Sequence, residues 1–193
     1  MVEEQLRSRG IEDERVLDAM ERVPRELFVP GELRDRAYAD VALPLTGGQT
    51  ISQPYMVAKI CEALSLRGAE RVLDVGTGSG YQAAVLAELA AEVHTIERIP
   101  ELAEQARSRL PANVHVHVGD GTNGLPALAP FDAIAVAAAA GEPPTALLQQ
   151  LAPGGRLVIP IGPPRRQVLH VYRPDGSVRK SVPCRFVPLV SEG

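Results

Sequence analysis

The sequence has no long apolar run, no excess of basic residues and little cysteine. Its longest apolar stretch, FDAIAVAAAAG, is too short to span a bilayer and contains an aspartate. The N-terminal MVEEQLRSRG has acids where a secretory signal needs basic and then apolar residues. The formal net charge of −4 disfavours nucleic-acid binding, because phosphate contacts require a surplus of Lys and Arg on one face. We therefore expect a cytoplasmic protein that binds neither a membrane nor a nucleic acid.

Metal and redox sites also find little support in the sequence. The two cysteines, Cys61 and Cys184, have neither C-x-x-C spacing nor neighbouring histidines, which favours buried free thiols. His115 and His117 alternate on one face of a predicted strand, but the histidines at positions 94 and 170 fall in strands that we expect to be unrelated. We therefore predict no metal site.

The length and composition are those of one folded domain. At 193 residues, the chain is long enough for one well-buried core and short for two. Hydrophobic residues make up 45% and charged residues 23%, close to an average soluble globular domain, so nothing argues for disorder. The sequence shows no internal repeat, low-complexity tract, linker or long heptad. We expect a single domain over residues 1–193 and, by default, a monomer.

From residue 71 onward, strand-like and helix-like patterns alternate. We predict strands at 71–75, 93–97, 114–118, 131–139 and 155–162, and helices at 81–90, 100–110 and 143–152. This alternation predicts right-handed crossovers and a mostly parallel sheet covered by helices on both faces. The predicted fold class is therefore α/β, with its core in residues 71–162.

A helical segment and a polar segment precede this core. Apolar residues within 11–23 lie at helical spacings before Pro24, so residues 1–45 are expected to form a helical cover. The stretch GGQTISQPYM, residues 47–56, then places three hydrogen-bonding side chains where an apolar-periodic helix begins. Ser52 fits either an N-cap of that helix or a functional hydroxyl, and the residues alone leave both interpretations open.

The tail, residues 163–193, has a different pattern. Residues 167–172 and 177–190 are extended runs around a Pro-Asp-Gly turn, which predicts an antiparallel hairpin added to the parallel sheet. Between Arg165 and Arg185, the tail holds five arginines and a lysine against one acid. Such a segment either attracts a substrate carboxylate or forms a solvated strand face.

The strongest chemical signal is DVGTGSG, Asp74 to Gly80, between the first predicted core strand and its helix. Glycines there let the backbone turn sharply and approach a ligand, while the helix N-terminus offers unpaired N–H groups. A dinucleotide fingerprint would need glycine at position 81, where this chain has Tyr81, and no Gly-Lys-Ser/Thr follows for a triphosphate. The loop therefore indicates a nucleoside ligand without a pyrophosphate cradle.

Acidic residues follow the predicted strands at the edge where such a ligand would bind. Asp74 and Glu97 end the first and second core strands, and Asp120 follows the third. Ligands of open parallel sheets sit at the carboxyl ends of the strands, and a group of acids favours a cationic ligand over a triphosphate. Taken singly, Asp74 and Asp120 could cap loops and Glu97 could be a solvated strand end. Together with the glycine loop, they favour S-adenosylmethionine, which carries adenine, ribose and a sulfonium cation.

Several longer stretches carry a resemblance to one family. They are VPRELFVP, GQTISQPYMVA, VLDVGTGSGYQAAVLAEL, IERIPELAEQAR, VGDG, APFDAI, GGRLVIPIG and RFVPLV. In this order they resemble the protein-L-isoaspartate O-methyltransferase family over nearly the whole chain. The resemblance implies a Rossmann-like, S-adenosylmethionine-dependent methyltransferase sheet with a family-specific arrangement of its last strands.

The resemblance also implies a reaction. The family methylates the free α-carboxyl of L-isoaspartyl residues in damaged proteins and peptides and releases S-adenosylhomocysteine. The ester collapses to a succinimide that hydrolyses partly to normal aspartate. A carboxylate is ionised at neutral pH, so the transfer needs orientation in a dry site rather than a general base.

Site residues are implied by position. The resemblance assigns the active-site hydroxyl to Ser52, and it places Gln49, Thr50, Ile51 and Ser52 along the cofactor and substrate. The methionine part would be held by Gly76, Gly78 and Ser79 beside Asp74. Glu97 would bind ribose, and Asp120 with Gly121 would hold adenine. The neutral groups of the 49–52 segment can orient a carboxylate without neutralising it, and its glycines permit closure over the site.

The sequence departs from the family pattern at four positions. Many relatives have a histidine at Val57, an aromatic residue at Thr122, and a threonine at Ala137 and at Val190. Lost hydroxyls could weaken binding or move substrate preference. Two alternatives to repair therefore stay open: methylation of aspartate in one dedicated peptide, and a non-catalytic S-adenosylmethionine-binding module.

Overall fold

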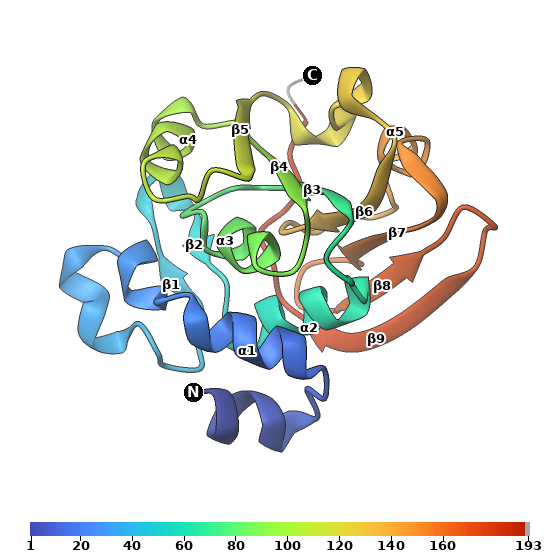
Figure 1. The fold of residues 1–193 in the computed structure, drawn as a ribbon. Helices are drawn as coiled ribbons and strands as arrows, with labels where there is room; N and C mark the ends of the chain where they lie inside the picture. The colour runs from blue at the N-terminus through green and yellow to red at the C-terminus, as the bar shows by residue number, and fades with distance from the viewer. Residues whose placement is uncertain (192–193) are drawn as a thin grey trace.

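A computed structural model describes residues 1–191 of the chain (Figure 1). Its main sheet has seven strands in the order β5-β4-β3-β6-β7-β8-β9. The strands are β3 (Arg71–Val75), β4 (Glu92–Glu97), β5 (Val114–Val118), β6 (Phe131–Val136), β7 (Leu151–Ile161), β8 (Gln167–Tyr172) and β9 (Val178–Cys184). Neighbours from β5 to β7 pair in parallel, and β8 and β9 each pair antiparallel with the strand before them. The predicted mostly parallel sheet with an antiparallel hairpin is confirmed.

Five α-helices and several short turns connect these strands. The helices are α1 (Glu14–Arg22), α2 (Pro54–Leu64), α3 (Tyr81–Ala87), α4 (Pro100–Arg107) and α5 (Thr145–Leu148). A two-stranded ribbon joins β1 (Leu43–Pro44) to β2 (Thr50–Ile51). Short π- or 3₁₀-helical turns are η1 (Val2–Leu6), η2 (Arg7–Arg9), η3 (Arg25–Phe28), η4 (Gly31–Arg36), η5 (Thr46–Gly48), η6 (Gly121–Asn123) and η7 (Pro126–Leu128).

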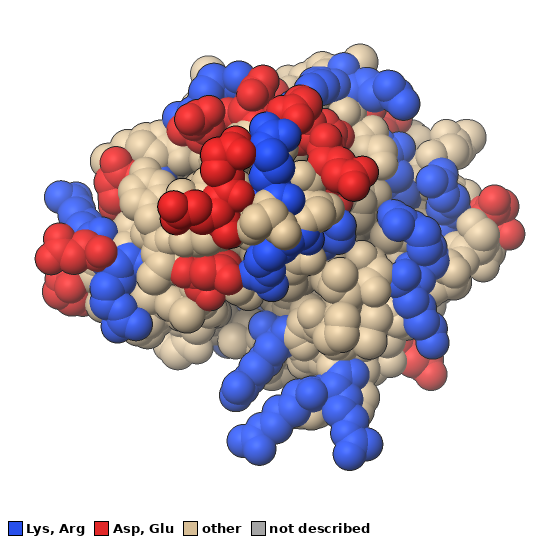
Figure 2. Space-filling view, turned by 90° about the horizontal axis from the view of Figure 1, so that it is seen from below, with Lys and Arg blue, Asp and Glu red and all other residues tan. Residues whose placement is uncertain are grey.

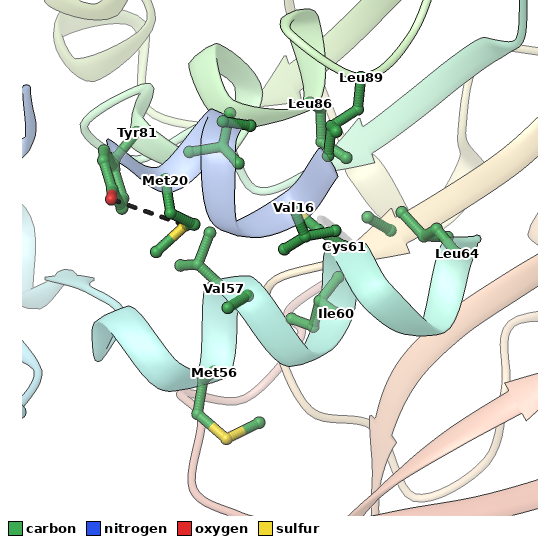
Figure 3. Packing of buried hydrophobic residues seen from close by; sticks show 14 of the residues in the cluster. Val16, Met20, Met56, Val57, Ile60, Cys61, Leu64, Tyr81, Leu86 and Leu89 are labelled. Atoms are coloured by element: carbon green, nitrogen blue, oxygen red, sulfur yellow. Dashed lines mark hydrogen bonds between the residues drawn. The ribbon is translucent and has the colours of Figure 1, made fainter. Parts of the chain in front are cut away.

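The helices cover the two faces of the sheet unequally. Figure 1 shows α1, α2 and α3 on one side and α5 on the other. Side chains alternate along β3, so that Val72 joins the larger cluster under α1 to α3, while Leu73 and Val75 join the smaller cluster near α5. In the larger cluster, Tyr81 of α3 donates a hydrogen bond to the sulfur of Met20 in α1 at 3.7 Å (Figure 3). Because the N-terminal segment shares this cluster with the sheet, we propose that residues 1–193 form one domain.

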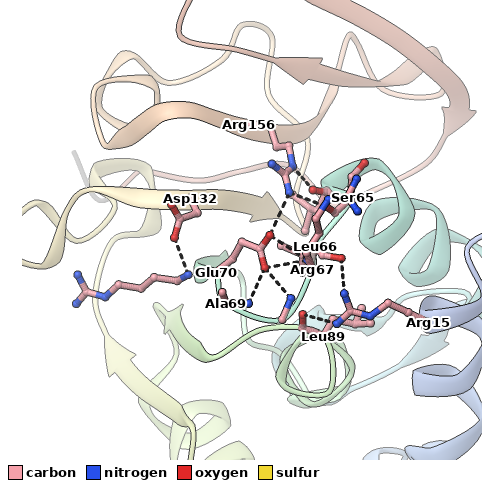
Figure 4. Close-up of polar contacts among 12 residues, drawn as sticks. Arg15, Ser65, Leu66, Arg67, Ala69, Glu70, Leu89, Asp132 and Arg156 are labelled. Carbon is pink, nitrogen blue, oxygen red and sulfur yellow. Dashed lines mark hydrogen bonds and ion pairs between the residues drawn. The ribbon is translucent and has the colours of Figure 1, made fainter.

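Side-chain hydrogen bonds fix the α2–β3 connection at the amino-terminal edge of the sheet (Figure 4). The carboxylate of Glu70 accepts hydrogen bonds from the backbone N–H groups of residues 67, 68 and 69 at 2.9 to 3.1 Å. Arg156 of β7 donates to the carbonyl of Ser65 at 2.8 Å, and Arg15 of α1 donates to that of Leu66 at 3.0 Å. These bonds satisfy backbone groups of a tight connection and fix where β3 begins.

Several predicted elements end earlier than expected: α3, α4 and β6 each end three residues early, and two other elements differ more. The helix predicted over 143–152 is limited to α5, because the side chain of Gln150 bonds the carbonyls of Asn123 and Ala146 and the N–H of Leu125, all at 2.8 or 2.9 Å. The extended run predicted over 177–190 leaves the ladder after β9. Residues 192 and 193 of the predicted tail lie outside the described part of the chain.

The end of the tail returns to the carboxyl end of β6. Gln167 of β8 pairs its side-chain amide with the backbone of Phe186, at 2.6 and 3.2 Å, which closes the hairpin. Beyond it, Ala139 donates to the carbonyl of Val187 at 2.8 Å and accepts from the N–H of Leu189 at 2.7 Å. The tail therefore forms one wall of the site described below.

No helix within residues 1–191 is both long enough and apolar enough to cross a membrane.

Candidate functional site

A cleft lies at the carboxyl ends of β3, β4 and β6. Strand β3 pairs with β4 on one side and β6 on the other, so the chain direction of the crossovers reverses there, and ligands of open α/β sheets bind at such a point. Of the sequence-predicted residues, those that line the cleft are Gln49, Thr50, Ile51, Ser52, Gly76, Gly78, Ser79, Glu97 and Gly121. Segments far apart in the sequence thus converge on one hollow.

The glycine loop between β3 and α3 is held close to its neighbours. Gly80 has a φ of +91°, and a Cβ there would lie 3.3 to 3.4 Å from Ala106 and Leu110 at the end of α4. This contact explains why the third glycine stands at position 80 rather than 81. Tyr81 instead begins α3 and is buried.

Glu97 is the acid that faces the cleft. Its side chain is buried, with one carboxylate oxygen accepting from the N–H of Gly78 at 2.9 Å and the other from the N–H of Ile99 at 3.0 Å. An ionised carboxylate has about four acceptor positions, so about two remain for a ligand. Glu97 thus both fixes the glycine loop and offers acceptors to a pair of hydroxyls, which excludes the solvated-strand-end alternative.

Asp74 lies beneath the loop rather than on the cleft surface. Its carboxylate is fully buried and accepts from Gln82 Nε2 at 2.7 Å and from Thr95 Oγ1 at 2.8 Å. Burial raises the pKa of Asp74 to about 6, although the two hydrogen bonds oppose the shift. Gln82 and Thr77 line the cleft, whereas Asp74 acts through the groups that it orients.

Asp120 forms the turn beside the cleft. One of its oxygens accepts from the N–H of Thr122 at 2.8 Å and from its hydroxyl at 2.6 Å. The next residue, Gly121, lines the cleft, and a Cβ there would lie 2.6 Å from Val75. The loop-capping interpretation of Asp120 is therefore correct, and its turn presents the backbone of Gly121 to the cleft.

The 49–52 segment separates the cleft from a second hollow. Within residues 1–191, the side chains of Gln49, Thr50 and Ser52 make no hydrogen bonds. Helix α2 begins at Pro54 with Gln53 at the N-cap position, and no side chain caps it. The interpretation of Ser52 as the N-cap is therefore wrong, and its hydroxyl is available to a ligand.

The second hollow, a groove, shares residues with the cleft. Thr50, Ser52, Ala137 and Val187 line both. Arg185 lines the groove further along the tail. A ligand in the cleft and another in the groove would meet across Ser52.

Three of the four departures from the family pattern face the cleft. Val57, Ala137 and Val190 line it with apolar atoms. Thr122 instead bonds Asp120. Val187, Pro188 and Leu189 of the tail, together with Gln82 and Arg98, also line the cleft and were not predicted from the sequence. The basic residues of the tail, the family-like RFVPLV stretch and the departure at Val190 had only indicated a role for the tail in general.

The histidines lie closer together than expected. His94 on β4 is the register partner of His115 on β5, and its Nδ1 lies 3.1 Å from Nε2 of His117. The expectation that position 94 lies in an unrelated strand was therefore wrong. Burial lowers the pKa of His94, while nearby Glu92 opposes that shift. Among the described residues, no group of three or more His, Cys, Asp and Glu could hold a metal ion.

The cysteines are both free thiols. Cys61 is buried in α2, and burial raises its pKa. Cys184 is only half-buried, contrary to expectation, because it lies at the end of β9 beside the groove, and burial raises its pKa to about 11. Neither is a reactive thiolate at neutral pH.

Comparison with known proteins points to one family. The model of the family described as "Protein-L-isoaspartate(D-aspartate) O-methyltransferase" matches residues 1–193. The chain is 58% identical over 201 residues to protein-L-isoaspartate O-methyltransferase 2 of Marinobacter nauticus, covering 100% of this chain and 92% of that one. It is 52% identical over 200 residues to the protein-L-isoaspartate O-methyltransferase of Methanoculleus marisnigri, covering 100% and 90%.

Two solved structures share the fold over almost the whole chain. One, from Plasmodium falciparum, is described as a candidate protein-L-isoaspartate O-methyltransferase in complex with S-adenosyl-L-homocysteine. It has a TM-score of 0.86 at 27% identity, covering 98% of this chain and 96% of that one. The other is described as a protein-L-isoaspartate O-methyltransferase and has a TM-score of 0.85 at 30% identity, covering 97% of this chain and 65% of that one.

Proposed function

Because the chain belongs to the protein-L-isoaspartate (D-aspartate) O-methyltransferase family, we propose that it methylates the free α-carboxyl of L-isoaspartyl residues in damaged proteins and peptides. The methyl ester then closes to a succinimide, whose hydrolysis returns part of the chain to L-aspartate. The observation that carries this proposal is the position of Ser52, whose unpaired hydroxyl lies where the cleft and the groove meet.

The cleft suits S-adenosylmethionine. The free acceptor positions of Glu97 would bind the two ribose hydroxyls, and the turn at Asp120 and Gly121 would hold adenine. Gly76, Gly78 and Ser79 form the loop that would hold the methionine part. When bound, this cofactor supplies an electrophilic methyl group on a positively charged sulfur. Asp74 contributes by orienting Gln82 and Thr95 rather than by lining the cleft.

The groove would hold the substrate peptide, with its carboxylate beside Ser52. The hydroxyls of Thr50 and Ser52 can each donate a hydrogen bond that turns a carboxylate oxygen toward the cleft. Both donors are neutral, so the oxygen keeps its negative charge and its nucleophilicity. The apolar side chains of Val57 and Val187 keep the meeting point poor in water, which strengthens these contacts.

The cellular setting is part of the same proposal. A cytoplasmic location agrees with the two free cysteines, since thiols persist in reducing compartments. We further propose that the protein acts as a monomer on small exposed segments of its substrates.

Two experiments test the proposal. The first follows an isoaspartyl peptide by reversed-phase chromatography and expects the matching aspartyl peptide to appear only when enzyme and S-adenosylmethionine are both present. The second compares Ser52→Ala with Ser65→Ala, a control at the distant C-cap of α2. Loss of one charge-assisted hydrogen bond should lower kcat/KM for the peptide by about 10- to 100-fold in Ser52→Ala, without changing S-adenosylhomocysteine affinity. Equal loss in both variants would contradict the role of Ser52.

A further inference from the structure

The groove beside Ser52 carries an uncompensated positive charge. Two arginines line it, Arg9 from the N-terminal segment and Arg185 from the tail. Among the described residues that line the groove, none is acidic. A substrate segment in the groove therefore meets a wall of one sign of charge.

The two arginines are not equivalent. Arg9 donates to the carboxylate of Asp40 at 2.6 Å, and its guanidinium lies 3.6 Å from the ring centre of Tyr55. Its charge is thus neutralised and its position fixed. Arg185 is exposed and makes no ion pair or hydrogen bond with any other residue of 1–191. The free cation of the groove is Arg185.

The other basic residues of the tail do not share this position. Figure 2 shows basic side chains along the side of the molecule where the β8–β9 hairpin lies in Figure 1. Arg173, Arg179 and Lys180 of this hairpin are exposed, but none of them lines the groove. These three side chains are solvated, while Arg185 lines the groove.

We propose that Arg185 sets a preference for isoaspartyl residues flanked by acidic side chains. This inference rests on the proposed function, because it concerns the segments on either side of the methylated residue. The acceptor carboxylate is served by the neutral hydroxyls of Thr50 and Ser52, so the charge of Arg185 is left for a neighbouring Asp or Glu of the substrate. A flanking Lys or Arg meets repulsion there.

The experiment uses the full-length protein and three peptides that differ only in the residues on both sides of one isoaspartyl residue: Glu, Gln or Lys. At low salt, kcat/KM should fall in the order Glu, Gln, Lys, with Glu above Lys by about fivefold, the effect of one exposed ion pair. In Arg185→Gln, the Glu-to-Lys ratio should fall close to one. In Arg185→Lys, which keeps the charge, most of the ratio should remain.

Arg179→Gln is the matched control, since it removes the same charge from β9 outside the groove. It should keep the wild-type ratio, and raising the salt to about 0.5 M should compress that ratio in the wild type. A wild-type enzyme without acid preference, or an Arg185→Gln variant that loses activity equally on all three peptides, would overturn the inference. Failure of the wild type to methylate any of the peptides would instead contradict the proposed function itself.

Discussion

Replacing Glu97 by Gln should weaken cofactor binding; the amide has one oxygen acceptor, so the variant also loses one of the two bonds from backbone N–H groups. The carboxylate accepts from the N–H groups of Gly78 and Ile99, at 2.9 and 3.0 Å, and keeps acceptors for two ribose hydroxyls. A hydrogen bond to a charged group contributes about 1 kcal/mol more than one between neutral groups. With two ribose bonds, the loss is about 2 kcal/mol, or about 30-fold in affinity.

Isothermal titration calorimetry with S-adenosylhomocysteine measures this loss directly. Glu101→Gln is the control, because Glu101 lies in the first turn of α4, is exposed and does not line the cleft. It should bind like the wild type. An affinity of folded Glu97→Gln within about threefold of the wild type, equivalent to less than about 0.7 kcal/mol, would refute the assignment of ribose to Glu97.

Three further substitutions test the supports of the site. Gly121→Ala should destabilise the protein by about 1 to 3 kcal/mol and weaken S-adenosylhomocysteine binding, because the added Cβ would lie 2.6 Å from Val75. The control Gly141→Ala, with open space around it, should change neither the stability in thermal melts nor the affinity in calorimetry. Burial raises the pKa of Asp74 from its ordinary value of 3.8 to about 6, so the folded state binds more protons than the unfolded state between these pH values. The wild type should thus lose about 3 kcal/mol relative to Asp74→Asn as the pH rises from about 4 to above 6, and a pH-independent difference would refute this. Partial burial disfavours the ionised form of Glu70, but hydrogen bonds from backbone N–H groups outweigh burial and lower the pKa of this carboxyl group. The ionised carboxylate therefore stabilises the folded state above the unfolded-state pKa, and this stabilisation is lost on acidification. Glu70→Gln should therefore lower the free energy of unfolding by about 2 kcal/mol at pH 7, and the difference from the wild type should close below about pH 4. Its peptide kinetics should be unchanged. Slowed kinetics in a variant as stable as the wild type would contradict a purely structural role of Glu70.

The alternating core could be predicted because its signals are local. The apolar run of β3, the glycines that follow it and the acid at the end of β4 each report a backbone requirement or a strand end in a few residues. Their convergence follows from one rule, that carboxyl ends of parallel strands share an edge. Glu97 was therefore placed correctly in the cleft without any knowledge of its partners.

The parts that the sequence did not predict depend on contacts between distant segments. The second half of the tail, residues 177–190, was predicted as one extended run, yet the pairing of Gln167 with Phe186 ends the hairpin, and residues 187–190 return to Ala139. Register across strands was equally hidden, which is why the proximity of His94 to His115 was missed. Asp74 and Glu97 both stand at predicted strand ends, but only the structure shows that Asp74 lies beneath the glycine loop while Glu97 lines the cleft.

A methyl-transfer assay tests most directly the proposal that the cleft binds the cofactor and the groove binds the substrate peptide. Purified protein should be offered methyl-labelled S-adenosylmethionine with two peptides that differ only in aspartate or isoaspartate at one position. The account predicts label on the isoaspartyl peptide alone, and its release in mild base, as expected of a carboxyl methyl ester. Label on both peptides, base-stable label, or no label despite measured S-adenosylhomocysteine binding would contradict it.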